Sequence, residues 1–150
     1  MYVDVVMEKT LKEAQDEVIE EFSMYDDWLD KYSALIEMGN SLESFPKELK
    51  TEDRLIKGCQ SRVWLDAQIK DGRVIFRADS DALITSCGEH KGIIALLVSV
   101  YSGRKAEEIA KDDFSFVERI GLKENLSPTR ANGLVSMIDT IKRKACEYGE

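Results

Sequence analysis

Cys59 has the sequence surroundings of a reactive cysteine. It stands in the stretch KGCQSR, between Lys57 and Arg62 and directly after Gly58. The glycine contributes no side-chain bulk, so a large partner can approach the sulfur. The two flanking cations favour the thiolate over the thiol, and the thiolate is the nucleophile. The pattern predicts an exposed nucleophilic cysteine, with a buried structural cysteine at the start of a strand as the alternative.

The rest of the sequence limits the reactions that Cys59 can perform. A cysteine hydrolase needs a base beside its nucleophile, but the only histidine is His90, and G-C-Q-S matches no hydrolase signature that we can apply. A thioredoxin-like reaction needs a C-x-x-C pair, which the chain lacks. A lone activated thiol therefore indicates transfer chemistry, in which a partner protein supplies the other groups.

The charge of the chain is unevenly distributed along the sequence. The stretch from Pro46 to Trp64 has five cations and three acids, a net charge of +2 in a chain of net charge −8. A chain this acidic is not expected to bind nucleic acid through a broad basic surface. The positive stretch, which includes Cys59, would suit docking to a partner of complementary charge, although a solvated loop of mixed charge would have the same composition.

Length and composition favour one domain over residues 1–150. The hydrophobic fraction of 43% and the charged fraction of 33% are typical of a soluble globular protein. No apolar run approaches the ~18–20 residues needed to span a bilayer, so no membrane partner is expected. The first residues, with Asp4 and Glu8, do not resemble a secretory signal. We therefore expect a cytoplasmic protein, where a disulfide framework among the three cysteines would be unusual.

Helical spacing of apolar residues predicts two helices before Cys59, with an Asp26 or Asp27 cap before the second and Gly39-Asn40 at its end. The first of them lies within residues 1–25. The apolar stripes are Met7, Leu11, Ala14, Val18, Ile19 and Phe22 in the first helix and Trp28, Leu29, Tyr32, Leu35 and Ile36 in the second.

After Cys59 the apolar period changes to two. Val63, Leu65, Ala67 and Ile69 alternate with polar residues, Asp71-Gly72 predicts a tight turn, and Val74, Phe76 and Ala78 resume the alternation. This is the pattern of a β-hairpin with one buried face.

Several helices are predicted after the hairpin. Ile93–Tyr101 is apolar on nearly every side, as in a central buried helix ended by Gly103. The predicted fold class is α+β, a small antiparallel β-sheet with helices packed on one face. Two short helices are expected at Ala106–Ala110 and Phe114–Ile120, then a last helix after Ser127-Pro128 with a stripe of Leu134, Met137, Ile138, Ile141 and Ala145.

Four blocks of the sequence resemble the SufE family, the sulfur acceptors of the Suf iron–sulfur assembly system. They are KGCQSRVWL (57–65), RADSDA (77–82), KGIIALL (91–97) and GLKENLSPTRANGL (121–134). The blocks follow one another in the family's order, and the resemblance runs from about Trp28 to the C-terminus. It implies a single domain with a SufE/IscU-like fold, in which the N-terminal helix within residues 1–25 carries no family motif.

The resemblance also implies a function for Cys59. In this family the corresponding cysteine takes persulfide sulfur from a cysteine desulfurase, stimulates that enzyme and delivers sulfur for iron–sulfur cluster assembly. The expected partners are a SufS-like desulfurase and a SufB-like scaffold in a SufBCD complex. No stand-alone activity and no cofactor are expected, because pyridoxal phosphate belongs to the desulfurase. Supporting residues would be Lys57, Gln60, Arg62 and Arg130; for Arg130 a plain helix-surface role is the alternative.

The resemblance is interrupted at Ser86–His90, a five-residue insertion that contains Cys87 and His90. SufE looks like a fold relative of the scaffold protein IscU, which binds metal or a nascent cluster through cysteines. The alternative function is therefore an IscU-like metal- or cluster-binding scaffold that uses Cys59, Cys87 and His90, with Asp79 or Asp81 as a further ligand. Two other hypotheses stay open. Cys87 could act as a resolving thiol, and the chain could activate a desulfurase by docking alone, without receiving sulfur.

Overall fold

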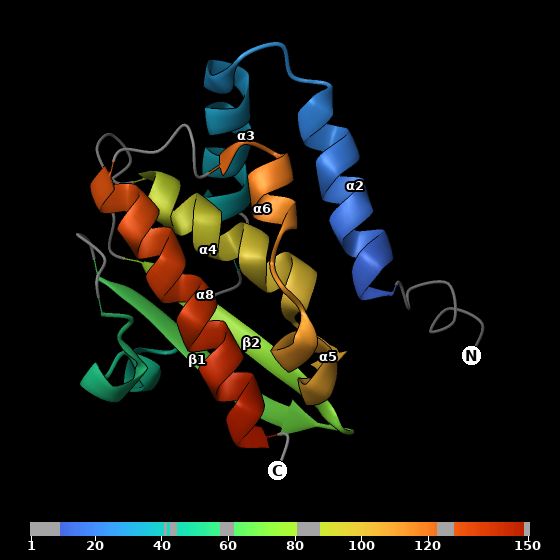
Figure 1. The fold of residues 1–150 in the computed structure, drawn as a ribbon. Coiled ribbons are helices and arrows are strands. Elements are labelled where there is room, and N and C mark those ends of the chain that lie inside the picture. Colours follow the sequence, from blue (N-terminus) through green and yellow to red (C-terminus); the bar gives the residue numbers. More distant parts are fainter. Residues whose placement is uncertain are drawn as a thin grey trace.

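The structure, a computed structural model, describes residues 10–40, 42, 45–57, 62–80, 88–122 and 128–148, without the side chains of 88–91, 128–130 and 148. Figure 1 shows an α+β arrangement of helices on a small sheet, as predicted. The helices are α2 (Leu11–Ser23), α3 (Trp28–Asn40), α4 (Gly88–Tyr101), α5 (Ala106–Lys111), α6 (Phe116–Arg119) and α8 (Pro128–Tyr148). Two 3₁₀ turns are η1 (Lys47–Leu49) and η2 (Glu52–Arg54), and the strands are β1 (Val63–Lys70), β2 (Arg73–Ser80) and β3 (Arg104–Lys105).

The sheet is antiparallel, in the order β1-β2-β3. β1 and β2 form the predicted hairpin, paired from Val63 with Ser80 to Lys70 with Arg73. Its turn residues Asp71 and Gly72 both have positive φ, 54° and 78°, as a tight two-residue hairpin turn requires. Strand β3 was not predicted, because two residues are too few to show an alternating pattern.

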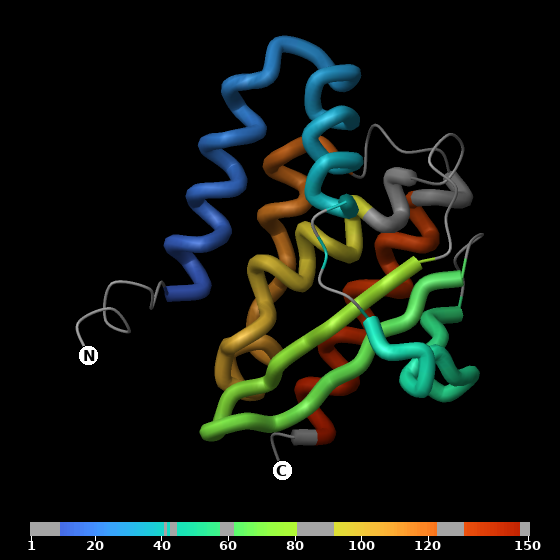
Figure 2. Tube along the Cα trace, turned by 180° about the vertical axis from the view of Figure 1, so that it is seen from behind, coloured from blue at the N-terminus to red at the C-terminus, as the bar shows by residue number. Residues whose placement is uncertain are grey.

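One face of the hairpin is apolar and lies under the helices (Figures 1 and 2). Val63, Leu65 and Phe76 point to this face and are almost fully buried against α4 and α8. The prediction of a buried Ile69 was wrong, since its side chain is 49% exposed. β1 is an edge strand, and α4 packs mainly on β2, so the far end of β1 extends beyond the helices.

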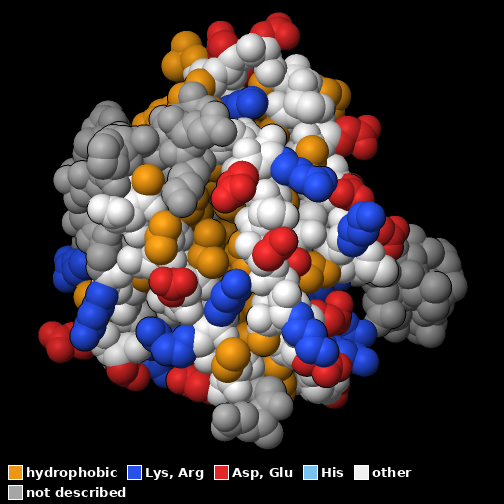
Figure 3. Space-filling view, viewed as in Figure 1, with side chains coloured by type: hydrophobic (Ala, Val, Ile, Leu, Met, Phe, Trp, Pro, Cys, Tyr) orange, Lys and Arg blue, Asp and Glu red, His pale blue; other side chains and the backbone are white. Residues whose placement is uncertain are grey.

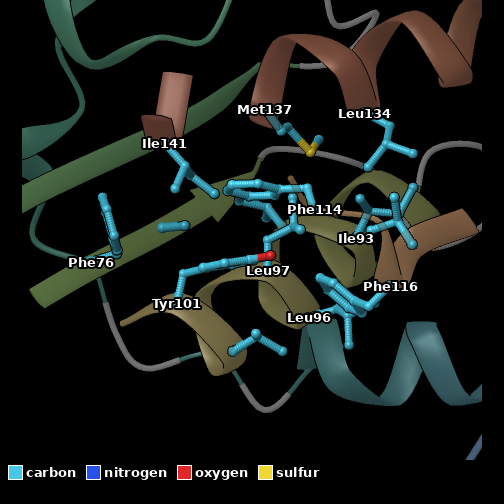
Figure 4. Close-up of a cluster of buried hydrophobic side chains, with 14 of the residues drawn as sticks. Phe76, Ile93, Leu96, Leu97, Tyr101, Phe114, Phe116, Leu134, Met137 and Ile141 are labelled. Carbon is cyan, nitrogen blue, oxygen red and sulfur yellow. The ribbon is translucent and has the colours of Figure 1, made fainter. Parts of the chain in front are cut away.

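Helix α4 runs through the centre of the core, as its all-round apolar sequence predicted. Ile93, Leu96 and Leu97 are fully buried, and Figure 4 shows them between side chains of α8, the sheet and the segment after α5. The predicted stripe of α8 is confirmed, with Ile138 partly buried and its other members buried. Those buried members are Leu134, Met137, Ile141 and Ala145.

Gly92 lies where α4 crosses α3. A Cβ atom on Gly92 would stand 2.1 Å from the carbonyl oxygen of Leu35. Real Cβ atoms never come this close to a backbone oxygen, so any larger residue would push the two helices apart. The close crossing gives a structural reason for the glycine of the KGIIALL block.

The two helices before the sheet begin at side-chain caps. Thr10 and Glu13 form a reciprocal capping box at the start of α2. At α3 the cap is Asp27, whose Oδ1 accepts a hydrogen bond from the Asp30 N–H at 3.0 Å. Leu29, expected in the buried stripe, is 71% exposed. The buried face of α3 is instead centred on Leu35, where α4 crosses it.

The helix predicted over Phe114–Ile120 is shorter in the structure and begins at Phe116. Phe114 has a φ of 56°, which is outside the helical range. Its N–H donates to Asp112 Oδ2 at 2.9 Å, and its ring stacks on Tyr101 with a centroid separation of 4.1 Å. Packing on Tyr101 therefore overrides the local helical pattern. Burial and the adjacent Asp112 carboxylate raise the pKa of Tyr101 far above its usual value.

No helix in the described part of the chain is both long and apolar enough to cross a membrane.

Candidate functional site

The two described ends of the Cys59 segment are paired with each other. Leu55 forms an isolated antiparallel bridge with Trp64, and the Ile56 N–H donates to the Val63 carbonyl at 2.8 Å. Residues 58–61, which include Cys59 and Gln60, lie outside the described residues. The segment from Lys57 to Arg62 thus begins and ends at one place, the start of β1.

Other family blocks begin or end at the same end of the molecule. Val63, the first residue of β1, pairs with Ser80, the last residue of β2. In both views α4 and α8 also start near this end of the sheet (Figures 1 and 2). Asp81 and Cys87 are outside the described residues. His90 and Arg130 lie in the first turns of α4 and α8, where the structure describes the backbone but not their side chains.

Trp64 lies on the outer face of the sheet, the one turned away from the helices, and two cationic side chains contact its ring. The Arg62 Cζ lies 5.6 Å from the centroid of its ring, and the Lys50 Nζ lies 5.2 Å from it. Both separations are within the range of a cation–π interaction. Although it is on the outer face, Trp64 is only 7% exposed. Arg62, expected to support Cys59, is thus placed on this indole.

Asp79 contacts Lys50, the lysine that also lies over the Trp64 ring. Its Oδ2 lies 3.1 Å from the Lys50 Nζ, and its Oδ1 accepts a hydrogen bond from the Ser80 N–H at 2.8 Å. Asp79 belongs to β2 and pairs directly with Trp64. Lys50 therefore contacts both strands at the end where the Cys59 segment begins.

Asp66 is a second acidic residue on the outer face, and it is 6% exposed. Its Oδ1 accepts a hydrogen bond from the Arg54 Nε at 2.9 Å, and its Oδ2 lies 3.7 Å from the Arg77 Nη2. Gln68 donates to the same carboxylate at 3.2 Å. Sequence reasoning assigned Asp66 to the solvent side of β1. The alternating pattern correctly predicted that Asp66 lies on the outer face. The sequence near Asp66 gave no sign that the segment with η1 and η2 would bury it.

Lys57, the other cation expected to support Cys59, is exposed. It lines a groove of about 480 Å³ between the η2 segment and α8, opposite Asp139 and Arg143. At the edge of this groove, a hydrogen bond from the Thr51 hydroxyl holds the pKa of Asp53 below its usual value. Basic and acidic side chains both line the groove. They are also interspersed over the face of the molecule that carries α8 (Figure 3). The described residues of this groove and this face therefore carry mixed charge and form no broad basic surface.

The structure does not test the alternative metal site. Among the described residues, no three His, Cys, Asp or Glu side chains are arranged to hold a metal ion. Cys59, Cys87 and the side chain of His90 lie outside that set, so the site with Asp79 stays a prediction. Cys146, for which no role is expected, is an exposed free thiol on α8.

Comparison with known proteins gives one consistent result. Residues 16–145 match the family model SufE, described as an Fe-S metabolism associated domain. An uncharacterized SufE-like protein of Rhizobium etli is 37% identical over 143 residues, 92% of this chain and 93% of that protein. The SufE-like protein 1, chloroplastic/mitochondrial, of Arabidopsis thaliana is 34% identical over 96% of this chain and 38% of its own length.

A solved structure shares the fold. It is the solution structure of a hypothetical protein from Thermus thermophilus, with a TM-score of 0.72 and 18% identity. The similarity covers 90% of this chain and 95% of that chain. Both the family model and the relatives span most of the described structure, including the hairpin, α4 and α8. The chain belongs to the SufE family, whose domain is associated with iron–sulfur metabolism.

Proposed function

We propose that this chain is a sulfur carrier that accepts sulfur on Cys59 from a cysteine desulfurase and delivers it for iron–sulfur cluster assembly. One observation carries the proposal beyond family membership. Pairing of Leu55 and Ile56 with Val63 and Trp64 fixes both ends of the Cys59 segment at the edge of the sheet. Lys57 and Arg62, the cations that flank Cys59 in sequence, stand at these fixed ends.

The transfer is an exchange reaction between sulfur atoms. The Cys59 thiolate attacks the terminal sulfur of a cysteine persulfide on the desulfurase. A new S–S bond forms at Cys59, the S–S bond of the donor breaks, and the donor cysteine leaves as a thiolate with the electron pair. The oxidation level of the transferred sulfur does not change, so the step needs no external oxidant or reductant. The proton on the terminal sulfur moves with it.

The partners divide the remaining chemistry between them. The pyridoxal phosphate that releases sulfur from free cysteine belongs to the SufS-like desulfurase, and we propose no cofactor for this chain. The acceptor would be a SufB-like scaffold, which attacks the Cys59 persulfide in the same way. Arg130 and Gln60 stay candidates for supporting roles on family resemblance.

Mass spectrometry tests the proposal directly. The chain is incubated with a cysteine desulfurase and free cysteine, and its intact mass is then measured. We expect a gain of one sulfur atom, which Cys59→Ala abolishes together with the stimulation of the desulfurase. Cys146→Ala is the matched control, because it removes an exposed thiol on α8 and should leave both effects unchanged.

Two results would contradict the proposal. Sulfur gain that persists in Cys59→Ala would place the carrier thiol elsewhere. Full stimulation of the desulfurase by Cys59→Ala, with no sulfur on the parent chain, would favour activation by docking alone. The cytoplasmic location expected from sequence also stays a prediction, because the Arabidopsis relative is named chloroplastic/mitochondrial.

A further inference from the structure

We propose that residues 45–57, the segment with η1 and η2, form a strap that opens as a unit from the outer face of the hairpin while the core stays folded. Ion pairs hold this strap closed, so its opening increases with ionic strength. The inference does not rest on the proposed function of Cys59. The structure describes every residue that carries it, and its test needs no desulfurase.

The strap has little regular structure of its own. Its two turns contain three residues each, and such short 3₁₀ turns have poor hydrogen-bond geometry. Figures 1 and 2 show them beside the start of β1. The buried residues of the strap are Phe45 and Ile56, near its two ends, which are 8% and 3% exposed. The position of the middle of the strap therefore depends on its contacts with the sheet.

Between these two ends, charged side chains of the strap contact the outer face of the hairpin. The Lys50 Nζ lies 3.1 Å from the Asp79 Oδ2 and 5.2 Å from the centroid of the Trp64 ring. The Arg54 Nε donates to the Asp66 Oδ1 at 2.9 Å. The Lys50 and Arg54 side chains are 34% and 28% exposed, so dissolved ions screen both contacts.

A groove lies on the other side of the strap. It has a volume of about 480 Å³ and runs between η2 and α8, with polar side chains such as Asp53 and Asp139 on its walls. Because this space lies between the η2 turn and the helix, the turn can leave the sheet without displacing α8.

The rest of the fold keeps its main contacts when the strap opens. The pairing of β1 with β2 and the apolar packing of the hairpin under α4 and α8 do not involve the turns η1 and η2. Opening breaks the backbone pairing of Ile56 and uncovers Trp64 and Asp66, which are 7% and 6% exposed when the strap is closed. Regions held by such different contacts open with different free energies. The strap directly precedes the Cys59 segment, so its opening also releases one of the two ends at which that segment is fixed.

The first test measures amide hydrogen exchange by NMR in the full chain. The Ile56 N–H donates to the Val63 carbonyl at 2.8 Å, so its exchange reports opening of the strap. The amide of Leu96, in the buried centre of α4, is the reference for the core. We expect Ile56 to exchange faster than Leu96. Its rate should rise roughly threefold when the ionic strength increases from about 0.01 M to about 1 M, with little change at Leu96.

Substitutions identify the contacts that hold the strap. Lys50→Gln should speed the exchange of Ile56 roughly threefold. Arg54→Gln should speed it roughly tenfold, because it removes a charged hydrogen bond to a buried carboxylate. In a chain with both substitutions, added salt should have little further effect. Lys70→Gln, at the exposed far end of β1, is the matched charge control and should leave the exchange of Ile56 unchanged.

Fluorescence tests whether the strap opens as a unit. In a chain with Trp28→Phe, Trp64 is the only tryptophan, and quenching by acrylamide measures the exposure of its ring. Arg54 contacts the Asp66 carboxylate. Arg54→Gln should nevertheless raise the quenching of Trp64 roughly twofold, because Lys50 leaves the ring together with the rest of the strap.

Three results would overturn the inference. Exchange of Ile56 at the rate of Leu96 would mean that the strap opens only when the core unfolds. A rate at Ile56 that responds neither to salt nor to the two substitutions would mean that the ion pairs do not hold the strap. Faster exchange at Ile56 with unchanged quenching of Trp64 would mean that one end frays alone. If Arg54→Gln does not fold, the salt dependence of exchange and quenching in the parent chain decides between the same outcomes.

Discussion

The two faces of the hairpin are buried by different kinds of contact. On the inner face, Val63 and Leu65 are buried by apolar packing under α4 and α8. On the outer face, Trp64 and Asp66 are buried almost as deeply, but their contacts are with Lys50, Arg54 and Arg77. The inner face holds the fold together, whereas the outer face arranges charge at the end where Cys59 joins the sheet. Mutations on the two sides should therefore separate stability from reactivity.

The largest loss of stability is expected on the helix side, for Gly92→Ala. The added Cβ would clash with the Leu35 carbonyl oxygen. The backbones of α3 and α4 would have to move apart, which would open the core between them. We expect a loss of about 3 kcal/mol in the free energy of unfolding, measured by urea denaturation. Ser99→Ala, on the exposed side of the same helix, is the control and should change it by less than about 0.5 kcal/mol.

Leu65→Ala should lower the free energy of unfolding by nearly as much, about 2–3 kcal/mol, because it leaves a cavity in the fully buried inner face. Ile69→Ala, four residues along the same strand and face, is the matched comparison. Its side chain is 49% exposed, so the cost should stay below about 1 kcal/mol. In neither variant should the folded protein lose the gain of one sulfur atom on Cys59 that the proposed function predicts, measured by intact mass. Equal losses at the two positions would show that the covered area of the sheet is larger than described.

Asp66→Ala should lower the free energy of unfolding less than Gly92→Ala or Leu65→Ala does, by about 1–2 kcal/mol in urea denaturation. The carboxylate is buried, but Arg54 and Arg77 are 28% and 31% exposed and can turn to water when it is removed. Glu48→Ala, at an exposed position of η1, is the control for a general loss of one acid. If both variants behave alike, the outer-face network has no special role.

The sequence was informative where structure depends on local patterns. Asp71-Gly72 specified the hairpin turn, and the stripe of α8 predicted its buried face. It was uninformative where burial depends on distant segments. The exposure of Leu29 follows from where α4 crosses α3, and the burial of Asp66 follows from the position of Arg54.

The same distinction applies to the site. The residues around Cys59 were found from their local motif, and the structure describes Lys57 and Arg62 at the two ends of that segment without testing their roles. The contact of Lys50 with Asp79 joins residues far apart in sequence and had no local signal. The geometry of Cys59, Gln60, Cys87 and the side chains of His90 and Arg130 lies outside the described residues, so their roles stay predictions.

The pairing of Leu55 and Ile56 with Trp64 and Val63 has a consequence for how this protein can change in evolution. Because the two ends of the segment are already held together, doubling the length of the chain between them costs only about 0.6 kcal/mol in closure entropy. An insertion between Lys57 and Arg62 is therefore expected to leave the pairing at the start of β1, and with it the fold, in place.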